Sequence, residues 1–254
     1  MNTAQDTAAA SPSFGAQALD LIVTLATAMA IALVLRVALF EPFTIPSESM
    51  EPGLQTGDYI VVSKWDYGWS RYSIPLGLPL FSGRVLQSKG PQRGDVVVFK
   101  LPRDPKETWI KRVIGLPGDR VQVRDGTVFV NDRPIVQSDD GLTQDPGAPD
   151  VTVQRKFEHR PDGRAYVTFD RGPFHDGDDT GVYRVPEGNY LMMGDNRDNS
   201  LDGRWPGSVG VGFVPAENIV GQARIVLLSW HGASILKPWT WLHVDLGRFC
   251  QLVR

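Results

Sequence analysis

Residues 21–40 form the longest apolar run of the chain, and Arg36 is their only charged residue. As an α-helix rising about 1.5 Å per residue, this run spans about 30 Å, which is the thickness of the hydrocarbon core of a bilayer. A cleaved secretory signal has a shorter apolar region behind a basic head, whereas residues 1–20 contain no Lys or Arg. We therefore predict one retained transmembrane helix over residues 20–40, after a disordered tail over residues 1–19.

The chain beyond the apolar run has the pattern of a β domain. Short runs rich in β-branched residues recur up to about residue 225, and each is bounded by turn residues such as Gly, Pro, Asn or Asp. Helical periodicity over ten or more residues is hard to find there. The pattern predicts a mostly β fold over residues 41–230, with antiparallel strands in a barrel-like arrangement or in two sheets. Residues 124–135 are predicted to form a hairpin with its turn near Val-Asn-Asp-Arg.

Two regions depart from this pattern. Residues 137–186 are denser in Asp, Gly, Pro and Arg and poorer in strand signal, which indicates a β-rich insert or cap that starts near residue 122. Residues 231–254 form a tail that either lies at a membrane interface or packs on the domain. A cluster of aromatic residues forms either an interfacial surface or an aromatic hairpin, and three tryptophans near the carboxyl end share the two interpretations of the tail. These residues are Trp65, Tyr67, Trp69, Tyr72, Phe81, Trp230, Trp239 and Trp241.

Composition and motifs exclude several classes of function. The formal net charge of −3 and the lack of a basic cluster argue against nucleic-acid binding. A calcium loop that opens at Asp195 fails, because Arg197 and Pro206 occupy positions that need oxygen ligands. The chain also lacks an H-E-x-x-H zinc helix and a G-x-S-x-G elbow, and none of its four histidines stands in a motif with a serine. We predict no metal and no cofactor.

A lysine is the remaining candidate for a catalytic base. Strand alternation places Trp109, Lys111 and Val113 on one face of a strand and the intervening residues on the other, and either face can be the buried one. An ordinary lysine is neutral only about 0.1% of the time at pH 7.4, so a lysine base has to be desolvated. The segment 46–50, "PSESM", offers hydroxyl groups close to the membrane, but spacing alone does not show that Ser49 and Lys111 meet.

Four segments together resemble the bacterial type I signal peptidases, which are membrane-anchored Ser/Lys proteases that remove signal peptides. They follow a membrane segment in the order of the family and cover most of residues 41–230. Any one of them would be modest evidence, whereas four in order are strong evidence. The segments are "IPSESMEPGLQTGDYIVVSK" (45–64), "RGDVVVFKLP" (93–102), "WIKRVIGLPGD" (109–119), and "GDNRDNSLDGR" (194–204) with "GFVPAENIVGQA" (212–223).

The resemblance implies catalytic roles for four residues. Ser49 matches the nucleophile of the family, and Lys111 matches the general base. Ser47 matches the side-chain donor of the oxyanion hole, and Ser200 matches the hydroxyl that orients the lysine. These roles are chemically coherent, because a desolvated lysine is basic enough to replace the usual histidine and carboxylate.

The resemblance also implies supporting and substrate-binding residues. Asp202 and Arg204 match a supporting ion pair, and Asp195 matches a structural acid of the same loop. Small side chains before the cut, as in the Ala-X-Ala end of signal peptides, would enter an apolar lining. The residues that match this lining are Phe43, Ile45, Pro46 and Ile110.

The chain departs from the family pattern at a few positions. Gly53 stands where Thr is common, which alters a turn. Trp109 replaces a frequent Tyr, which changes the shape of the pocket. Residues 205–210, "WPGSVG", lengthen the closing segment and should form a loop beside the site. A single anchor, where better-known members have two, implies that the amino terminus lies in the cytoplasm and the domain on the outer side of the bacterial cytoplasmic membrane.

The sequence therefore predicts a membrane-bound serine endopeptidase whose partners are secretory preproteins and the lipid bilayer. Two alternatives stay open at this point. One is a Ser/Lys maturation peptidase devoted to a single exported substrate. The other is a non-catalytic, membrane-tethered β domain that binds extended peptides. The oligomeric state is not predicted.

Overall fold

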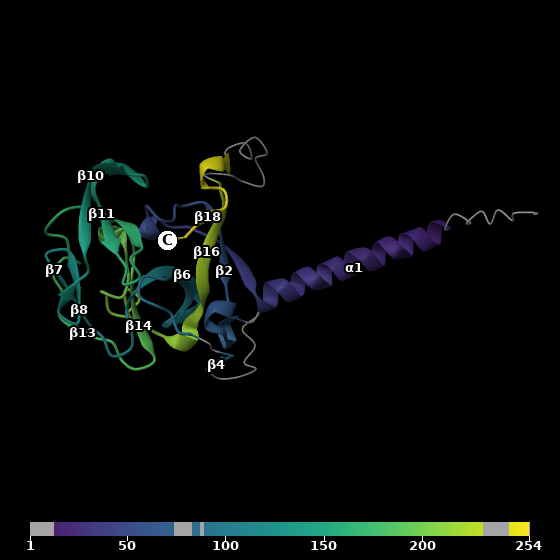
Figure 1. Ribbon diagram of the computed structural model, residues 1–254, viewed down its shortest axis with the longest axis horizontal. Coiled ribbons are helices and arrows are strands. Elements are labelled where there is room, and N and C mark those ends of the chain that lie inside the picture. Colours follow the sequence, from purple (N-terminus) through teal and green to yellow (C-terminus); the bar gives the residue numbers. More distant parts are fainter. Residues whose placement is uncertain (1–12, 74–82, 87–88, 231–243, 254) are drawn as a thin grey trace, which may run out of the picture.

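A single long helix, α1 (Phe14–Ala38), projects from a β domain (Figure 1). The computed structural model describes residues 13–73, 83–86, 89–230 and 244–253. The helix begins earlier than predicted, because the Ser13 hydroxyl caps it by accepting from the Ala16 N–H at 3.4 Å. The predicted disordered tail was therefore wrong for residues 14–19, and residues 1–12 lie outside the described residues.

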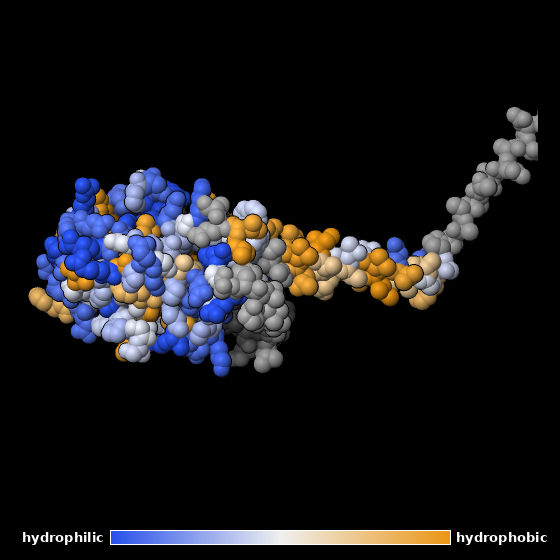
Figure 2. All heavy atoms as spheres, turned by 90° about the horizontal axis from the view of Figure 1, so that it is seen from below, coloured by the Kyte–Doolittle hydropathy of each residue, from blue (hydrophilic) through white to orange (hydrophobic). Residues whose placement is uncertain are grey.

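The apolar character of α1 is exposed on all sides. Residues Phe14–Arg36 have a mean hydropathy of 2.4 and make the one helix, within the described ranges, that is long and apolar enough to cross a membrane. Figure 2 shows this as a mainly orange rod beside a domain whose visible face is mostly blue and white. A helix that is apolar all round and not buried by the described part of the domain has the form of a membrane anchor.

The β domain is built on one large antiparallel sheet, and the predicted mostly β, antiparallel fold is confirmed. Strands β1, β2, β16, β5, β6, β14 and β15 follow one another across it, and β17 and β18 add to β16. The described part of the carboxyl-terminal tail is thus paired with the domain. The strands are β1 (Phe40–Thr44), β2 (Asp58–Ser63), β5 (Val96–Leu101), β6 (Asp104–Gly115), β14 (Asn189–Met193), β15 (Phe213–Pro215), β16 (Ile219–Trp230), β17 (Val244–Asp245) and β18 (Gln251–Leu252).

The predicted insert consists of two smaller sheets. The predicted hairpin at 124–135 is present, and its turn residues Asn131 and Asp132 both have positive φ. The weak strand signal after residue 137 was misleading, because a long hairpin lies there with most of its residues exposed, so it lacks apolar alternation. The strands are β7 (Arg120–Arg124), β8 (Thr127–Val130), β9 (Arg133–Pro134) and β13 (Tyr183–Arg184) in one sheet, and β10 (Gln137–Asp145), β11 (Ala148–His159) and β12 (Ala165–Asp170) in the other.

The aromatic cluster divides between the surface and the interior. Trp65 is 58% exposed and meets Trp69 edge-on, with ring centroids 5.5 Å apart, whereas Tyr67 is buried. Phe81, Trp239 and Trp241 lie outside the described residues. Trp69 itself lies in a two-stranded ribbon of β3 (Trp69–Ser70) and β4 (Arg84–Val85). The short 3₁₀ turns are η1 (Glu48–Met50), η2 (Trp65–Tyr67), η3 (Arg71–Ser73), η5 (Arg197–Asn199), η6 (Ala216–Asn218) and η8 (Leu246–Arg248).

Strand β6 carries apolar packing on both of its faces. Ile110 belongs to a core cluster with Ile45 and Val98, whereas Val113 belongs to a second cluster with Phe99. Every residue of β6 from Ile110 onward is buried. The sequence left open which face of this strand is buried, and the answer is that both are. Any polar side chain in this stretch is therefore removed from water.

Candidate active site

Ser49 lies in η1, on the segment that connects β1 to β2. Its side chain is buried, and the neighbouring Met50 is anchored in the core. Backbone hydrogen bonds hold both ends of the segment. Ile45 N–H donates to the carbonyl of Asp58 at 2.9 Å, and Asn196 N–H donates to the carbonyl of Ser49 at 3.2 Å. The serine is thus placed by backbone contacts rather than by its own side chain.

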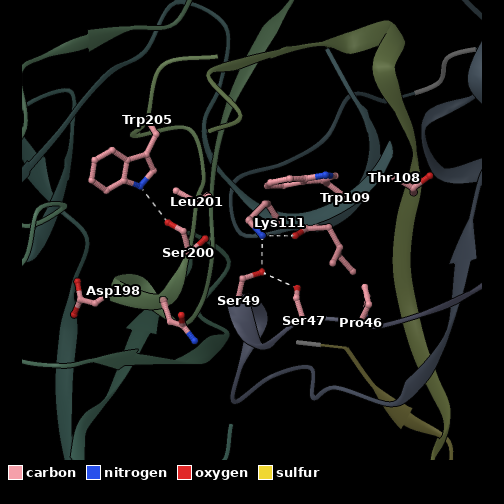
Figure 3. A pocket seen from close by; sticks show the side chains of 12 residues that line it. Pro46, Ser47, Ser49, Thr108, Trp109, Lys111, Asp198, Ser200, Leu201 and Trp205 are labelled. Carbon is pink, nitrogen blue, oxygen red and sulfur yellow. Dashed lines mark hydrogen bonds between the residues drawn. The ribbon is translucent and has the colours of Figure 1, made fainter. Parts of the chain in front are cut away.

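Lys111 reaches the same point from β6. Its side chain is 3% exposed, and Nζ donates to Ser49 Oγ at 2.6 Å and to the carbonyl of Ile110 at 3.1 Å (Figure 3). The Trp109 ring lies over the amine, with its centroid 5.4 Å from Nζ. The structure therefore brings Ser49 and Lys111 together. Their spacing in the sequence could not show this contact.

Burial changes the acid–base character of this lysine. Desolvation lowers the pKa of Lys111 from its ordinary 10.5 to about 8, against the opposing pull of Asp202 and Asp195, and the positive charge of Arg204 lowers it further. A lysine with this pKa is neutral about a fifth of the time at pH 7.4. The neutral amine, which is the form that accepts a proton, is thus far more abundant than in an exposed lysine.

Two buried ion pairs support the site. The Asp195 carboxylate accepts hydrogen bonds from Nε and Nη2 of Arg112, at 2.7 and 2.6 Å. Asp202 pairs with Arg204 at 3.0 Å and also accepts from the Gly194 N–H at 3.0 Å. The sequence predicted the second pair from the family resemblance but missed Arg112, whose only signal was its place beside Lys111 on a buried strand.

The remaining predicted polar residues lie nearby with looser contacts. Ser47 is exposed, and its Oγ lies 3.4 Å from Ser49 Oγ. Ser200 is buried at the edge of the site, but its Oγ has no hydrogen-bond partner among the residues that the structure describes. The orienting contact predicted from Ser200 to Lys111 is not made, and the carbonyl of Ile110 is the second acceptor of the amine instead.

A cleft of about 500 Å³ opens over the Ser49–Lys111 pair. Of the four residues predicted to line a substrate pocket, Pro46 and Ile110 do line it. Ile45 is buried in the core and Phe43 packs against that core, so neither lines the cleft. The lining consists of Pro46, Ser47, Ser49, Thr108, Trp109, Ile110, Lys111, Asp198, Asn199, Ser200, Leu201 and Trp205.

Sequence reasoning missed much of the opposite wall of this cleft. Trp205 opens the 205–210 segment, which was predicted only as a loop beside the site. Its indole N–H donates to the carbonyl of Ser200 at 3.2 Å, and Leu201 stands next to it, 49% exposed. An exposed leucine beside a tryptophan belongs to no periodic pattern in the sequence. The lengthened 205–210 segment was therefore the only sign of this wall.

The chemistry of this arrangement is that of a serine hydrolase. A hydroxyl bonded to a partly neutral amine can be deprotonated for attack on a carbonyl, in a cleft open enough for a peptide. The described ranges contain no group of three or more acidic, His or Cys side chains that could hold a metal. The fold and the site together define a membrane-tethered β protein with a Ser/Lys pair.

Comparison with known proteins places the chain within that class. The family model "Signal peptidase, peptidase S26" matches residues 18–230, so the chain belongs to this family. Signal peptidase I of Rickettsia typhi is 40% identical over 85% of this chain and 80% of its own length. Signal peptidase I of Rickettsia akari is 38% identical over 82% and 84%. A solved signal peptidase I from Enterococcus faecalis V583 is 28% identical, covers 53% of this chain and 97% of its own, and has a TM-score of 0.31.

Proposed function

We propose that this chain removes signal peptides from secreted preproteins, with Ser49 as nucleophile and Lys111 as general base. The observation that carries the proposal is the 2.6 Å contact between Lys111 Nζ and Ser49 Oγ in a buried site. The neutral amine takes the hydroxyl proton while Oγ attacks the scissile carbonyl. The ammonium then returns the proton to the leaving amine, and water hydrolyses the ester that remains on Ser49.

The oxyanion of this reaction needs donors beside Ser49. We assign this role to the Ser49 backbone N–H and to the Ser47 hydroxyl. The Ser47 hydroxyl is 3.4 Å from the nucleophile, so it makes only a weak contact that a substrate oxygen can replace. Pro46 and Ile110, with the mainly apolar cleft around them, fit small apolar side chains before the cut.

We further propose that the domain works on the outer face of the bacterial cytoplasmic membrane, with α1 as a single-pass anchor. The family resemblance supports this orientation. The short connection from Phe40 to Ser49 supports a site close to the bilayer, because an extended chain reaches at most about 30 Å over nine residues. A substrate whose apolar segment is still embedded lies within that reach.

A panel of unrelated preproteins tests the proposal. The full chain in detergent should cut each of them after a small residue, and Ser49→Ala should cut none while keeping the wild-type melting temperature. Cleavage of only one preprotein would favour the specialised maturation peptidase. No product from the wild type would leave only the non-catalytic, peptide-binding interpretation, whereas equal product from wild type and Ser49→Ala would exclude Ser49 as the nucleophile.

A further inference from the structure

A pair of buried carboxyl groups lies directly behind the nucleophile segment. Glu51 follows Ser49 by two residues and is 3% exposed, and Asp145, at the end of β10, is completely buried. Asn196, which donates to Asp145 through its side chain and to the Ser49 carbonyl through its backbone, places the two carboxyl groups on the same side of the segment, and each acts on the charge of the other. Two ionised carboxylates buried next to each other repel, so the pair favours a state in which one of them keeps a proton.

The surrounding donors decide which carboxyl group is ionised. Asp145 accepts from Arg171 Nη2 at 3.1 Å, from Asn196 Nδ2 at 3.4 Å and from the Gly147 N–H at 3.1 Å. Glu51 has no comparable set, and its Oε2 is buried without a hydrogen-bond partner among the described residues. The proton therefore resides on Glu51, next to an ionised Asp145.

The pair connects the nucleophile to the insert. Glu51 belongs to the segment that carries Ser49, whereas Asp145 belongs to the β10–β11 hairpin. Asn196 bonds both sides, because its backbone N–H donates to the Ser49 carbonyl and its side chain donates to Asp145. On the other side of Ser49, Glu48 accepts from Asn199 Nδ2 at 3.1 Å.

We propose that the protonated Glu51–Asp145 pair is a positioning latch that holds the Ser49 segment against the insert, and that ionisation of Glu51 opens it. This inference rests on the proposed role of Ser49. The groups that face the pair fix the direction of the effect. Burial and the negative charges of Asp145 and Glu48 raise the pKa of Glu51 to about 7, while Arg171 helps to keep the pKa of Asp145 low.

The latch predicts a pH-dependent difference between wild type and Glu51→Gln. The amide of Gln is neutral, as the protonated carboxyl is, but does not ionise. The ratio of kcat/KM, Glu51→Gln over wild type, should be near 1 at pH 6. It should rise to about tenfold at pH 8 if the ionised pair is inactive, because about a tenth of Glu51 is then protonated. The loss should fall on kcat rather than on KM. Glu187→Gln, an exposed change elsewhere, is the control.

A second variant separates the latch from a general need for acidic residues. Asp145→Asn should be the more damaging amide substitution, because it places an NH₂ group or a weaker acceptor among three converging donors. A ratio of Glu51→Gln to wild type that stays constant from pH 6 to 8.5, or an Asp145→Asn milder than Glu51→Gln, overturns the latch. If the wild type cuts no preprotein, the proposed function fails instead.

Discussion

At the scale of single residues, burial alone does not make a lysine a base. Lys64 and Lys111 are 1% and 3% exposed. Lys64 forms a salt bridge with Glu41 at 2.8 Å, whereas Lys111 meets only a hydroxyl and a carbonyl and has no salt-bridge partner among the described residues. An ion pair favours the charged amine, and desolvation without one favours the neutral amine. The absence of a carboxylate partner is thus what suits Lys111 to accept a proton.

The pH dependence of cleavage should report this neutral amine. Because burial lowers the pKa of Lys111 to about 8, its proton-accepting form increases as pH rises through 8. We expect kcat/KM of Glu51→Gln, which lacks the alkaline titration of the latch, to rise with an apparent pKa near 8 and to level off above about pH 9. In the same background Lys111→Arg should lose activity at every pH, with Lys106→Arg as the exposed control. A rise centred near pH 10.4 would contradict a desolvated base.

Residue-scale contacts were the least predictable part of the site. Ser49 and Lys111 could be paired only through the family resemblance, because strand alternation left either face of β6 open to burial. Glu51 and Asp145 escaped notice altogether, since nothing local distinguishes a protonated carboxyl from a solvated one. Their interaction arises only when the insert folds back onto the nucleophile segment.

At the scale of elements, the turn after β14 packs the closing segment against the nucleophile. A Cβ at Gly194 would lie 2.4 Å from the Ser49 carbonyl oxygen and 2.3 Å from Ser200 Oγ. Only glycine allows the two segments to approach so closely. Strands β5 and β16 were readable from their β-branched runs, whereas the exposed β10–β11 hairpin was not, because a ribbon in water needs no apolar alternation.

Gly194→Ala should therefore damage catalysis more than stability. The Ser200 hydroxyl can rotate away, but the Ser49 carbonyl is backbone and has to move together with its side chain. We expect kcat to fall by about 10²-fold, the effect of a displacement near 1 Å at a reacting group. Gly181→Ala, where a Cβ meets nothing within 4 Å, should match wild type. Unchanged kcat in Gly194→Ala, measured by steady-state cleavage, would show that the nucleophile segment tolerates the shift.

At the scale of the whole molecule, the anchor runs almost directly into the catalytic sheet. Only Leu39 separates α1 from β1, and its carbonyl accepts from the Lys64 N–H at 2.9 Å. The salt bridge between Glu41, in β1, and Lys64, directly after β2, fastens the start of the sheet at the same place. The helix thus leaves the domain at one fixed place (Figure 1).

A flexible spacer inserted at this junction should slow the cleavage of membrane-embedded substrates but not of soluble ones. Eight Gly/Ser residues inserted after Leu39 should lower the cleavage of a preprotein in proteoliposomes several-fold, because the site is then no longer held near the bilayer. Cleavage of a short soluble peptide should stay unchanged. The same insertion in the exposed turn at Gly163 is the control. Equal losses on both substrates would mean that the insertion damages the fold instead.

The short junction at Leu39 also makes cleavage depend on the distance of the cut site from the membrane. In the proposed orientation, with α1 in the membrane and only Leu39 between it and β1, the serine hydroxyl stands at a set height over the lipid. A precursor is then selected by two properties. One is the small residues near its cleavage site, and the other is the distance from the bilayer at which its apolar segment holds that site. Precursors with the same sequence around the cleavage site but apolar segments of different length would then be cleaved at different rates, because their cleavage sites lie at different distances from the bilayer.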